Sequence, residues 1–461
     1  MTELSKYNPV TPEFISLLRN EVCEQALVLD PHKLSEFGKD AGTLSVTPEI
    51  TVEATNVEQV RAVLRLCDRY RVPVTPRGSG TGLAGGSVPM HGGVVLSLAK
   101  MKEMHIDKAN LLAVVEPGVV TADLKKAARA QGLFYPPDPA SLDTCSIGGN
   151  AATNAGGPSC IKYGTTRDYV LGLDAVLAGG ELIRAGVQTR KGVVGYDMAH
   201  LLIGSEGTLG VITKLYLKLI PHPPALTTLV ALFPDLSSAM TTVSAVLAAG
   251  YSPCAMEFLD RHCIELIGDL LPFEGVRESG SFLIIEIDGP PEVISRQIEG
   301  AGVICMEHGA IDARFAPDSQ KRAHMWEVRR QVSLRIEHNA PLYIPEDIVV
   351  PLGRIAEFVD RLPPLESRYG FKIYCFGHAG DGNIHLNITA EGEHSPEIEE
   401  GIEAVLFEVL SMDGTISGEH GIGIAKKRFL SMELSEDVIR LQKEIKRVFD
   451  PNMTLNPGKL F

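Results

Sequence analysis

Apolar side chains in the first half of the chain recur at spacings that predict helices alternating with short strands. Thr11 and Asn56 are residue types that cap helix N-termini, and each precedes apolar residues at helical spacing. Thr121 is expected to cap a further helix, which ends at Gly132. Shorter apolar runs predict strands at residues 72–75, 94–98, 111–116, 170–177 and 211–219.

A cluster of prolines, Pro221, Pro223 and Pro224, marks a boundary beyond which the pattern changes. Strands are predicted at residues 228–233, 256–259 and 282–287, with helices at 237–249 and 292–299. This order is typical of an α+β domain with helices on an antiparallel sheet. Two further helices are expected, over residues 318–339 and 436–449. The first places Trp326, Arg329 and Ser333 on one face.

A glycine-rich stretch separates the predicted strands at residues 72–75 and 94–98. Five glycines fall between Gly78 and Gly86, with hydroxyls at Ser79 and Thr81 and a cation at Arg77. Successive amides in such a loop can turn toward one anion. The spacing is neither the Rossmann fingerprint nor the P-loop. The stretch therefore predicts a loop that holds a dinucleotide pyrophosphate, and a flexible linker is the alternative.

A second glycine-rich block covers residues 146–159 and follows a proline-rich run at 135–139. It is too long for a turn, and loops of that length are normally functional or disordered. Ile147, Ala151 and Ala152 make it too apolar for disorder. We therefore expect its backbone to lie against a flat ligand.

Histidines gather in two short glycine-framed segments of the second half. His378 and His385 lie on predicted strands that flank a Gly-Asp-Gly turn, so a hairpin can bring their imidazoles together. Glu419 and His420 form the second segment. Two histidines and a carboxylate are a usual catalytic metal set with open positions. The alternatives are a metal-free histidine site and structural histidines, and Asp381 is interpreted as a turn residue, with a further ligand as the alternative.

Composition excludes several classes of protein. With 461 residues the chain is expected to form two or three domains. Its formal charge of −15 argues against nucleic acid as a partner. Eight scattered cysteines without a C-x-x-C argue against iron–sulfur and structural zinc sites. The absence of a secretory signal or an 18-residue apolar window predicts a cytoplasmic protein with reduced thiols and no transmembrane segment.

Several motifs together give a specific resemblance over roughly residues 45–461. They are Pro-Arg-Gly-Ser-Gly-Thr-Gly-Leu at 76–83, Ser-Ile-Gly-Gly-Asn from 146, Gly-Ser-Glu-Gly-Thr-Leu-Gly-Val-Ile-Thr at 204–213, Gly-His-Ala-Gly-Asp-Gly-Asn-Ile-His from 377, Gly-Glu-His-Gly from 418 and Leu-Asn-Pro-Gly-Lys at 455–459. The chain resembles the FAD-dependent D-2-hydroxy acid dehydrogenases of the vanillyl-alcohol-oxidase superfamily. The resemblance implies an α+β fold: a two-lobed PCMH-type FAD-binding domain, an α+β cap domain with an antiparallel sheet, and a helical tail that returns to the flavin.

The resemblance also implies domain boundaries. A helical lead-in occupies residues 1–44 and the FAD-binding domain residues 45–222. The substrate or cap domain covers residues 223–415, and residues 416–461 complete the active site.

Non-covalent FAD is the implied cofactor, because Thr81 stands where covalently flavinylated members of the superfamily often carry a histidine. Residues 76–83 would hold the pyrophosphate, 137–157 the flavin and ribityl chain, Glu206 to Ile212 the adenosine end, and Asn456 would approach the isoalloxazine ring. The predicted FAD contacts are Pro76, Arg77, Gly78, Ser79, Gly80, Thr81, Gly82, Gly86, Ser87, Pro117, Gly118, Pro137, Asp138, Ser146, Gly148, Gly149, Asn154, Gly156, Gly157, Glu206, Gly207, Gly210, Ile212 and Asn456.

Carried over residue by residue, the family's site implies His378, His385 and Glu419 as ligands of one divalent metal ion, Zn, Mn or Fe(II). His420 matches its general base, Arg329 the arginine that binds the substrate carboxylate, and Ser333 and Asn387 two polar substrate contacts. The hydroxyglutarate enzymes have a lysine near Pro345, which this chain lacks. That departure favours D-lactate or a similar monocarboxylate.

Oxidation of an α-hydroxy acid removes a hydroxyl proton and a Cα hydride. The expected enzyme is an FAD-dependent D-lactate dehydrogenase, in which His420 takes the proton and flavin N5 the hydride. A glycolate-oxidising subunit, a D-2-hydroxyglutarate dehydrogenase and a flavin electron-transfer subunit without substrate chemistry are the alternatives. An external acceptor is expected, whether an electron-transfer flavoprotein, an iron–sulfur subunit or a quinone, and a homodimer is possible.

Overall fold

The computed structural model describes residues 6–316 and 319–461, which form two compact units. The first unit contains the described residues up to Ala155, then Thr165–His222 and Glu419–Phe461. The second contains Gly156–Gly164 and Pro223–Gly418. The predicted division did not separate residues 156–164 from the surrounding FAD-binding domain. Among the described residues, no helix has both the length and the apolar character that a bilayer crossing requires.

A four-stranded sheet forms the first lobe of unit 1. Its strands run in the order β1 (Leu27–Val28), β2 (Ile50–Glu53), β4 (Val94–Ser97) and β3 (Val74–Arg77). Strands β2 and β3 are both parallel to β4, so the carboxyl ends of β3 and β4 lie at one edge. Helices α1 (Pro12–Glu21), α2 (Pro31–Phe37) and α3 (Val57–Tyr70) accompany this sheet. The predicted caps are confirmed, because Thr11 and Asn56 each accept a hydrogen bond from the amide three residues on.

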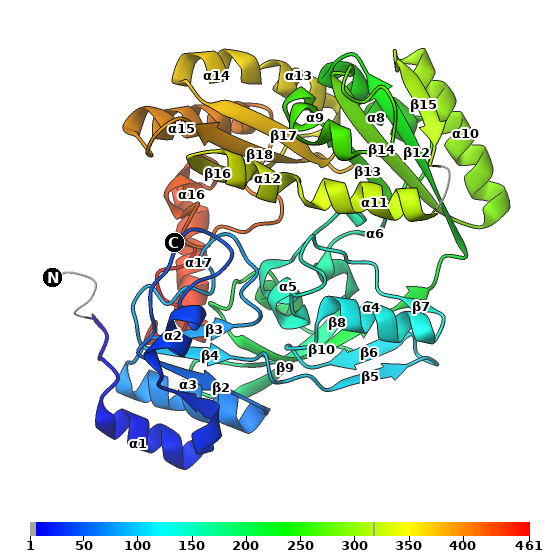
Figure 1. Cartoon of the computed structure of the whole chain (residues 1–461). Coiled ribbons are helices and arrows are strands. Elements are labelled where there is room, and N and C mark those ends of the chain that lie inside the picture. Colours follow the sequence, from blue (N-terminus) through cyan, green and yellow to red (C-terminus); the bar gives the residue numbers. More distant parts are fainter. Residues whose placement is uncertain (1–5, 317–318) are drawn as a thin grey trace. The chain divides into compact units, whose positions relative to one another are not determined.

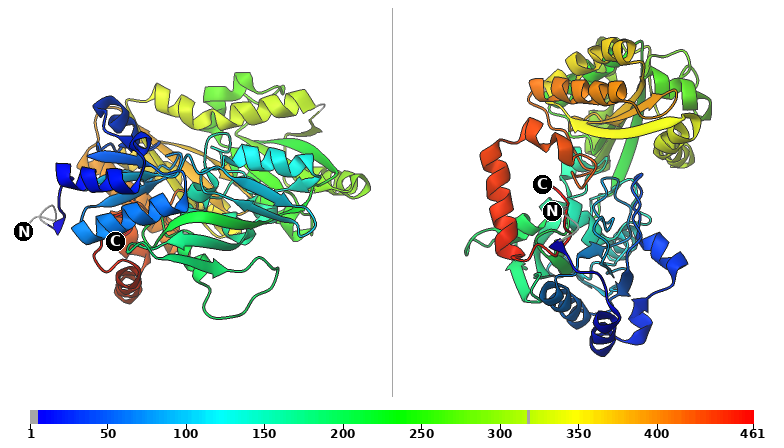
Figure 2. Two further views of the ribbon diagram at one scale, coloured as in Figure 1. Left: turned by 90° about the horizontal axis from the view of Figure 1, so that it is seen from below. Right: turned by 90° about the vertical axis from the view of Figure 1, so that its left-hand side faces the viewer.

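A five-stranded antiparallel sheet forms the second lobe. Its order is β5 (Met104–Asp107), β6 (Leu112–Val115), β10 (Val211–Lys218), β8 (Val170–Val176) and β9 (Leu182–Gly186). This lobe also contains α4 (Thr121–Ala130), β7 (Leu133–Phe134), α5 (Ile147–Thr153), α7 (Met198–Leu202) and β11 (Ile220–Pro221). Beyond β9 a loop carries Val193, Val194 and Tyr196 at 94–100% exposure, and Figure 2 shows it extending from the sheet.

Two local expectations for this lobe are wrong. Thr121 is not a cap: it is the first residue of α4, behind Val120, and its hydroxyl accepts a hydrogen bond of 2.8 Å from Asn150 Nδ2. The block at 146–159 is not wholly irregular, because Ser146 caps α5 through its side chain. A glycine-rich sequence forms a helix there since Ile147 and Ala151 are buried in the core.

The C-terminal part of unit 1 contains α16 (Leu430–Glu433) and α17 (Glu436–Phe449), and the tail helix has the predicted bounds. The face of α17 that is buried carries a lysine: Lys446 donates to Thr208 O and Leu455 O and pairs with Asp450. Leu455 then bridges to Val74 at the edge of β3. This pairing brings residues 454–459 beside the glycine-rich loop that follows β3.

A seven-stranded sheet forms the centre of unit 2, with neighbouring strands antiparallel as predicted (Figure 1). Its order is β15 (Asp312–Phe315), β12 (Ala225–Phe233), β14 (Ser281–Gly289), β13 (Ala255–Leu259), β17 (Lys372–His378), β18 (Asn383–Ala390) and β16 (Leu342–Val349). Helices α8 (Leu236–Ala248) and α10 (Pro291–Glu307) pack on one face, and α13 (Ile355–Asp360) packs on α8. The other helices of this unit are α6 (Cys160–Tyr163), α14 (Leu362–Tyr369) and α15 (Pro396–Ser411).

The opposite face of this sheet is covered by α9 (Arg261–Ile267), α11 (Ser319–Arg330) and α12 (Val332–Asn339). Their apolar residues form one core with Ile284 and Phe376. The single long helix expected over residues 318–339 is wrong: α11 ends at Arg330 and α12 begins at Val332. Its expected first residue, Asp318, lies outside the described residues. The α+β fold class is confirmed.

Candidate functional site

The glycine-rich loop of unit 1 is built around the guanidinium of Arg77. Arg77 NH1 donates to Lys39 O at 2.6 Å and to Ser87 Oγ at 3.1 Å. A Cβ at Gly80, which has φ +74°, would lie 2.1 Å from Arg77 NH2. Glycine is therefore favoured at this point, because the left-handed backbone conformation strains other residues and a side chain would displace the Arg77 guanidinium.

Asp40 holds the far end of the loop, a role that was not predicted from the sequence. Its carboxylate accepts hydrogen bonds of 2.9 Å from the amides of Gly42 and Gly85. Burial raises the pKa of Asp40, and the two amides and Arg77 offset part of that shift. Within the described residues, the amides of Ser79 to Leu83 donate to no protein acceptor. They are therefore available to bind an anion.

Four of the predicted cofactor-binding segments pack against one another. A Cβ at Gly78 would lie 2.3 Å from Ser146 Oγ, and one at Gly148 would lie 2.4 Å from Pro117 Cβ. A third contact joins Gly207 to Pro76, where a Cβ would lie 2.7 Å from Pro76 Cγ. Glycines thus let the backbones of residues 76–78, 117, 146–148 and 207 meet in one place.

The chain's C-terminal segment reaches the same place through Glu206 and Asn456. Glu206 has φ +51°, and its carboxylate accepts hydrogen bonds of 2.8 Å from the amides of Ile422 and Gly423. Burial raises the pKa of Glu206, and these amides lower it in part. Asn456 Nδ2 donates to Gly86 O and Glu206 O, whereas Asn456 Oδ1 is buried and accepts from no described residue. A buried acceptor without a partner fits a site for a bound polar group.

Lys459 adds a buried cation to this region. Its Nζ donates to Val88 O at 2.7 Å, and the side chain is 3% exposed. Burial lowers the pKa of Lys459 to about 8, while Glu206 and Asp40 act in the opposite direction. Lys459 is the last residue of the Leu-Asn-Pro-Gly-Lys motif, and no role was predicted for it.

The other predicted cofactor residues differ in their contacts and in how deeply they are buried. Gly118 donates its amide to Met101 O, and Pro137 O accepts from Lys125 Nζ beside Asp138. Asn154, at φ +53°, accepts hydrogen bonds from residues 165 and 167 through its side chain. Gly149, Thr81 and Gly82 lie in the segments described above. Gly210 directly precedes β10 and Ile212 lies within it, and both pack into the core. Gly156 and Gly157 belong to unit 2.

The predicted histidine hairpin is present in unit 2. Strands β17 and β18 pair with Phe376 opposite His385 and His378 opposite Asn383. The rings of His378 and His385 meet edge to face, with centroids 5.2 Å apart. Gly382 makes the turn possible, since it has φ +85° and a Cβ there would lie 2.2 Å from Val350 O. Asp381 Oδ1 accepts from the Asn383 amide, as expected for a turn residue.

Asp347 joins this pair from β16, although no role was predicted for it. It lies opposite His385 in the register, with Oδ1 3.9 Å from His385 Nδ1. Asn383 Nδ2 donates to Asp347 Oδ1 at 2.6 Å. Asp347 Oδ2 accepts from the Gly418 amide at 2.8 Å, which holds the chain at the residue before Glu419. Glu419 and His420 begin the last segment of unit 1, and their roles stay predictions.

Arg329 is buried in unit 2 and is not a solvated surface residue. It is 8% exposed, and its guanidinium lies over the Phe376 ring, 4.5 Å from the centroid. Its NH2 lies 2.7 Å from Glu257 Oε2 in an ion pair. Glu257 Oε1 accepts a hydrogen bond from His378 Nδ1. Burial raises the pKa of Glu257, but the nearby His378 and Arg329 outweigh it and leave that pKa below its usual range.

Asn387 lies on the same face of β18 as His385, two residues further along. Its Oδ1 accepts a hydrogen bond of 2.6 Å from Tyr343 OH. Burial raises the pKa of Tyr343 to about 12, and a hydrogen bond with Ser333 lowers it in part. The side chains of Ser333, Tyr343 and Asn387 therefore form one polar chain beside the histidines. Asn387 Nδ2 is buried and donates to no described residue.

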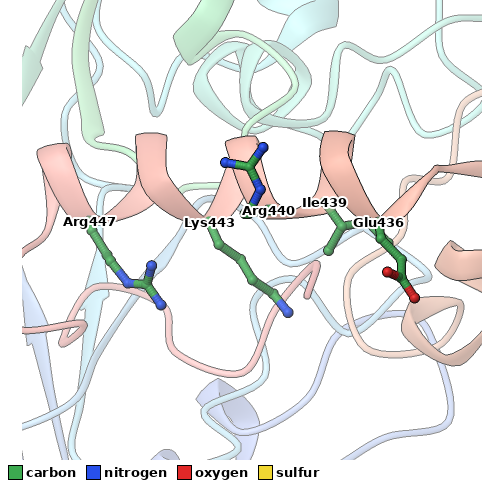
Figure 3. A pocket seen from close by; sticks show the side chains of 5 residues that line it. All are labelled: Glu436, Ile439, Arg440, Lys443 and Arg447. Atoms are coloured by element: carbon green, nitrogen blue, oxygen red, sulfur yellow. The ribbon is translucent and has the colours of Figure 1, made fainter.

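A shallow pocket on α17 contains none of these residues. It is lined by side chains of that helix alone: Glu436, Ile439, Arg440, Lys443 and Arg447 (Figure 3). Arg440 pairs with Asp437 and Glu444 on the same helix. The pocket is therefore a charged surface groove and gives no argument for catalysis.

Two family models cover most of the chain. The "FAD binding domain" matches residues 48–186, and "FAD linked oxidases, C-terminal domain" matches residues 222–460. The chain is 40% identical to the glycolate oxidase subunit GlcD of Bacillus subtilis (strain 168) over 90% of its length and 89% of the relative's. It is 39% identical to a D-lactate dehydrogenase of Anaerostipes hadrus, over 99% and 98% of the two chains. It is 33% identical to a D-2-hydroxyglutarate dehydrogenase of Stutzerimonas stutzeri (strain A1501), over 98% and 99%.

Solved structures of lower identity share the fold. A p-cresol methylhydroxylase with substrate bound has a TM-score of 0.79 at 17% identity and covers 97% of this chain and 96% of its own. An alkyldihydroxyacetonephosphate synthase has a TM-score of 0.76 at 19% identity and covers 99% and 88%. The fold is thus the predicted PCMH-type FAD-binding fold with a second α+β unit, and the chain belongs to the FAD-linked oxidase family. It is an FAD-dependent dehydrogenase.

Proposed function

We propose that this dehydrogenase oxidises a small D-2-hydroxy acid, with D-lactate as the first candidate. The observation that carries the proposal is a pair of buried donors without acceptors among the described residues, Arg329 Nε and Asn387 Nδ2. Leaving a buried donor unpaired costs about 1–3 kcal/mol. A substrate with a carboxylate and a neighbouring oxygen would satisfy both, beside the histidine pair.

The side chains of β16 favour a monocarboxylate. Tyr343, Pro345 and Asp347 alternate on the face that carries Asn387 and His385. None of these three is a cation that could bind a second carboxylate, and Asp347 would repel one. D-lactate also agrees with the names of two relatives at 39–40% identity.

The residues around the glycine-rich loop fit FAD as a non-covalent cofactor. The free amides of residues 79–83 would hold its diphosphate, and the orphaned Oδ1 of Asn456 offers an acceptor to a ring N–H. Thr81 has no nucleophilic nitrogen or sulfur for a covalent bond. Bound FAD supplies the acceptor for the substrate hydride.

His378, His385 and Glu419 would hold the divalent ion, Zn, Mn or Fe(II). The donor set fits, since the two imidazoles lie in contact and His378 Nδ1 is already engaged by Glu257, which leaves Nε2 as its ligand atom. A divalent ion held there would lower the pKa of a substrate hydroxyl.

His420 would take the hydroxyl proton as general base, a role that contributes about 10²- to 10⁴-fold to rate in enzymes. Arg329 would hold the substrate carboxylate, and Ser333 and Asn387 would orient its oxygens. Electrons would leave to an electron-transfer flavoprotein, an iron–sulfur subunit or a quinone. We further propose a cytoplasmic location and a homodimer.

Anaerobic flavin reduction tests the proposal. Purified protein should carry FAD that acid releases, and D-lactate should bleach its visible absorbance while L-lactate should not. His420→Ala should keep the flavin and lose the bleaching. If no 2-hydroxy acid bleached the wild-type flavin, the chain would be an electron-transfer subunit instead.

Glycolate is the second candidate, because the GlcD subunit of Bacillus subtilis matches this chain at 40% identity. Glycolate lacks the methyl group of lactate, so the two differ in the apolar contact they offer. Rates of flavin reduction by D-lactate, glycolate and D-2-hydroxyglutarate rank the three.

A further inference from the structure

The only acidic side chain on β13 lies inside an apolar strand, where a charge is costly. Glu257 stands between Met256 and Phe258 and is 1% exposed. Burying an unpaired carboxylate costs several kcal/mol, so its two oxygens need strong partners. Each oxygen has a different one. Oε1 accepts from His378 Nδ1, and Oε2 pairs with Arg329 NH2 at 2.7 Å.

We infer that Glu257 is the positioning residue that sets two parts of the active site at once, the proposed metal ligand His378 and the proposed carboxylate-binding Arg329. This inference rests on the proposed function and adds a residue to it. An ionised carboxylate only accepts hydrogen bonds, so it keeps the His378 proton on Nδ1 and the lone pair on Nε2. Such partners orient metal-binding histidines and raise their basicity.

The same carboxylate fixes the guanidinium of Arg329. Glu257 holds NH2 from one side, and the Phe376 ring lies against the guanidinium at 4.5 Å. Among its other donors, Nε is buried and has no hydrogen-bond partner among the described residues. A rigid guanidinium loses less conformational entropy when it binds a carboxylate. The register supports the arrangement, because β13 pairs with β17 through Glu257 opposite His378.

Glu286 on β14 provides a matched control. It is also buried, at 4% exposure, and it also binds side chains of α11. Arg322 and Trp326 donate to its carboxylate. Changing either glutamate to glutamine removes one buried charge beside one arginine of α11. Of these two glutamates, Glu257 is the one that binds His378.

The experiment compares Glu257→Gln and Glu286→Gln in FAD-loaded protein that has been stripped of divalent metal with a chelator. Co²⁺ alone is the metal probe, followed by its visible absorption, and D-lactate is the substrate probe. An amide has one acceptor oxygen and cannot serve both partners. Glu257→Gln should weaken Co²⁺ binding about 10- to 100-fold and raise the KM for D-lactate. Glu286→Gln should leave the Co²⁺ affinity and the KM within twofold of wild type. This should hold even when its midpoint of thermal unfolding falls as far as that of Glu257→Gln.

Equal effects of the two variants would overturn the inference, because they would show a general loss of stability. The inference would also be overturned if Glu257→Gln kept its Co²⁺ affinity and its KM for D-lactate within twofold of wild type. If that variant does not fold, Glu257→Asp keeps the charge at a shorter reach and should show the same two changes. Wild-type protein that takes up no Co²⁺ would contradict the proposed metal site itself, and with it the role at His378.

Discussion

Glu206 Oε2 accepts a hydrogen bond of 2.8 Å from the amide of Gly423, although 217 residues separate the two in sequence. The neighbouring Ile422 amide binds the other carboxylate oxygen. One buried side chain thus attaches the C-terminal segment to the loop that precedes β10. The attachment matters for function because the segment also carries Asn456 to the glycine-rich loop.

Glu206→Ala should therefore destabilise the first unit. It leaves two amides without an acceptor, at about 1–3 kcal/mol for a buried donor. The midpoint of thermal unfolding should fall by several degrees, and FAD should dissociate more readily. Glu58→Ala is the control, since the Glu58 side chain is 72% exposed. An unchanged midpoint in Glu206→Ala would show that the carboxylate does not hold the segment.

Gly207→Ala should weaken FAD binding by pushing Pro76 out of place. Gly207 has φ +69°, and a Cβ there would lie 2.7 Å from Pro76 Cγ. Gly132→Ala is the matched control, because Gly132 has φ +75° in the same unit but a Cβ there meets nothing within 4 Å. Both pay the same backbone strain, of order 1–3 kcal/mol. The flavin-to-protein absorbance ratio after dialysis should fall only for Gly207→Ala; equal ratios would contradict the packing argument.

Arg329→Lys should raise the KM for D-lactate about 10- to 100-fold, because hydrogen bonds between charged groups contribute about 1.5–3 kcal/mol and each 1.4 kcal/mol is tenfold. Lysine keeps the charge beside Glu257 but lacks the planar set of donors. FAD content should not change. Arg322→Lys, on the same helix and paired with Glu286, should leave KM as it is. A KM that rose equally in both variants would assign the effect to α11 and not to substrate binding.

The lowered pKa of Lys459 predicts how the stability of the protein depends on pH. Its pKa is lowered from 10.5 to about 8 in the folded protein, chiefly by burial. Between these values the unfolded chain binds a proton that the folded protein does not, so unfolding free energy rises with pH from about 8 to about 10.5. Thermal midpoints measured across that range should rise in wild type relative to Lys459→Met. Exposed Lys443→Met should follow wild type, and parallel curves for all three would contradict the lowered pKa.

Local signals predicted local structure well. Thr11 and Asn56 cap helices as expected because the hydrogen bond that defines a cap spans only three residues. Thr121 has the same residue type in the same context, yet its hydroxyl is used by Asn150 from another segment. Nothing within three residues of Thr121 could reveal that partner.

The candidate site divides in the same way. The hairpin that brings His378 and His385 together was predictable, since a short turn dictates which residues face each other. Glu257 and Asp347 were missed, although acidic residues within an otherwise apolar strand are a signal for a buried, partnered charge. Asp40 gave no such signal, because its partners are backbone amides that any residue provides.

The tail helix α17 shows which features the sequence determines and which the tertiary structure decides. Sequence by itself determined that residues 436–449 form a helix, because caps and apolar periodicity act within a few turns. Only the tertiary structure decided which face is buried: Lys446 is 3% exposed, whereas Val448 is 78% exposed. The lysine is buried because Asp450 and two carbonyl groups, including that of Thr208, surround its ammonium. Periodicity records the hydrophobicity of a side chain but not the partners that the rest of the fold brings to it.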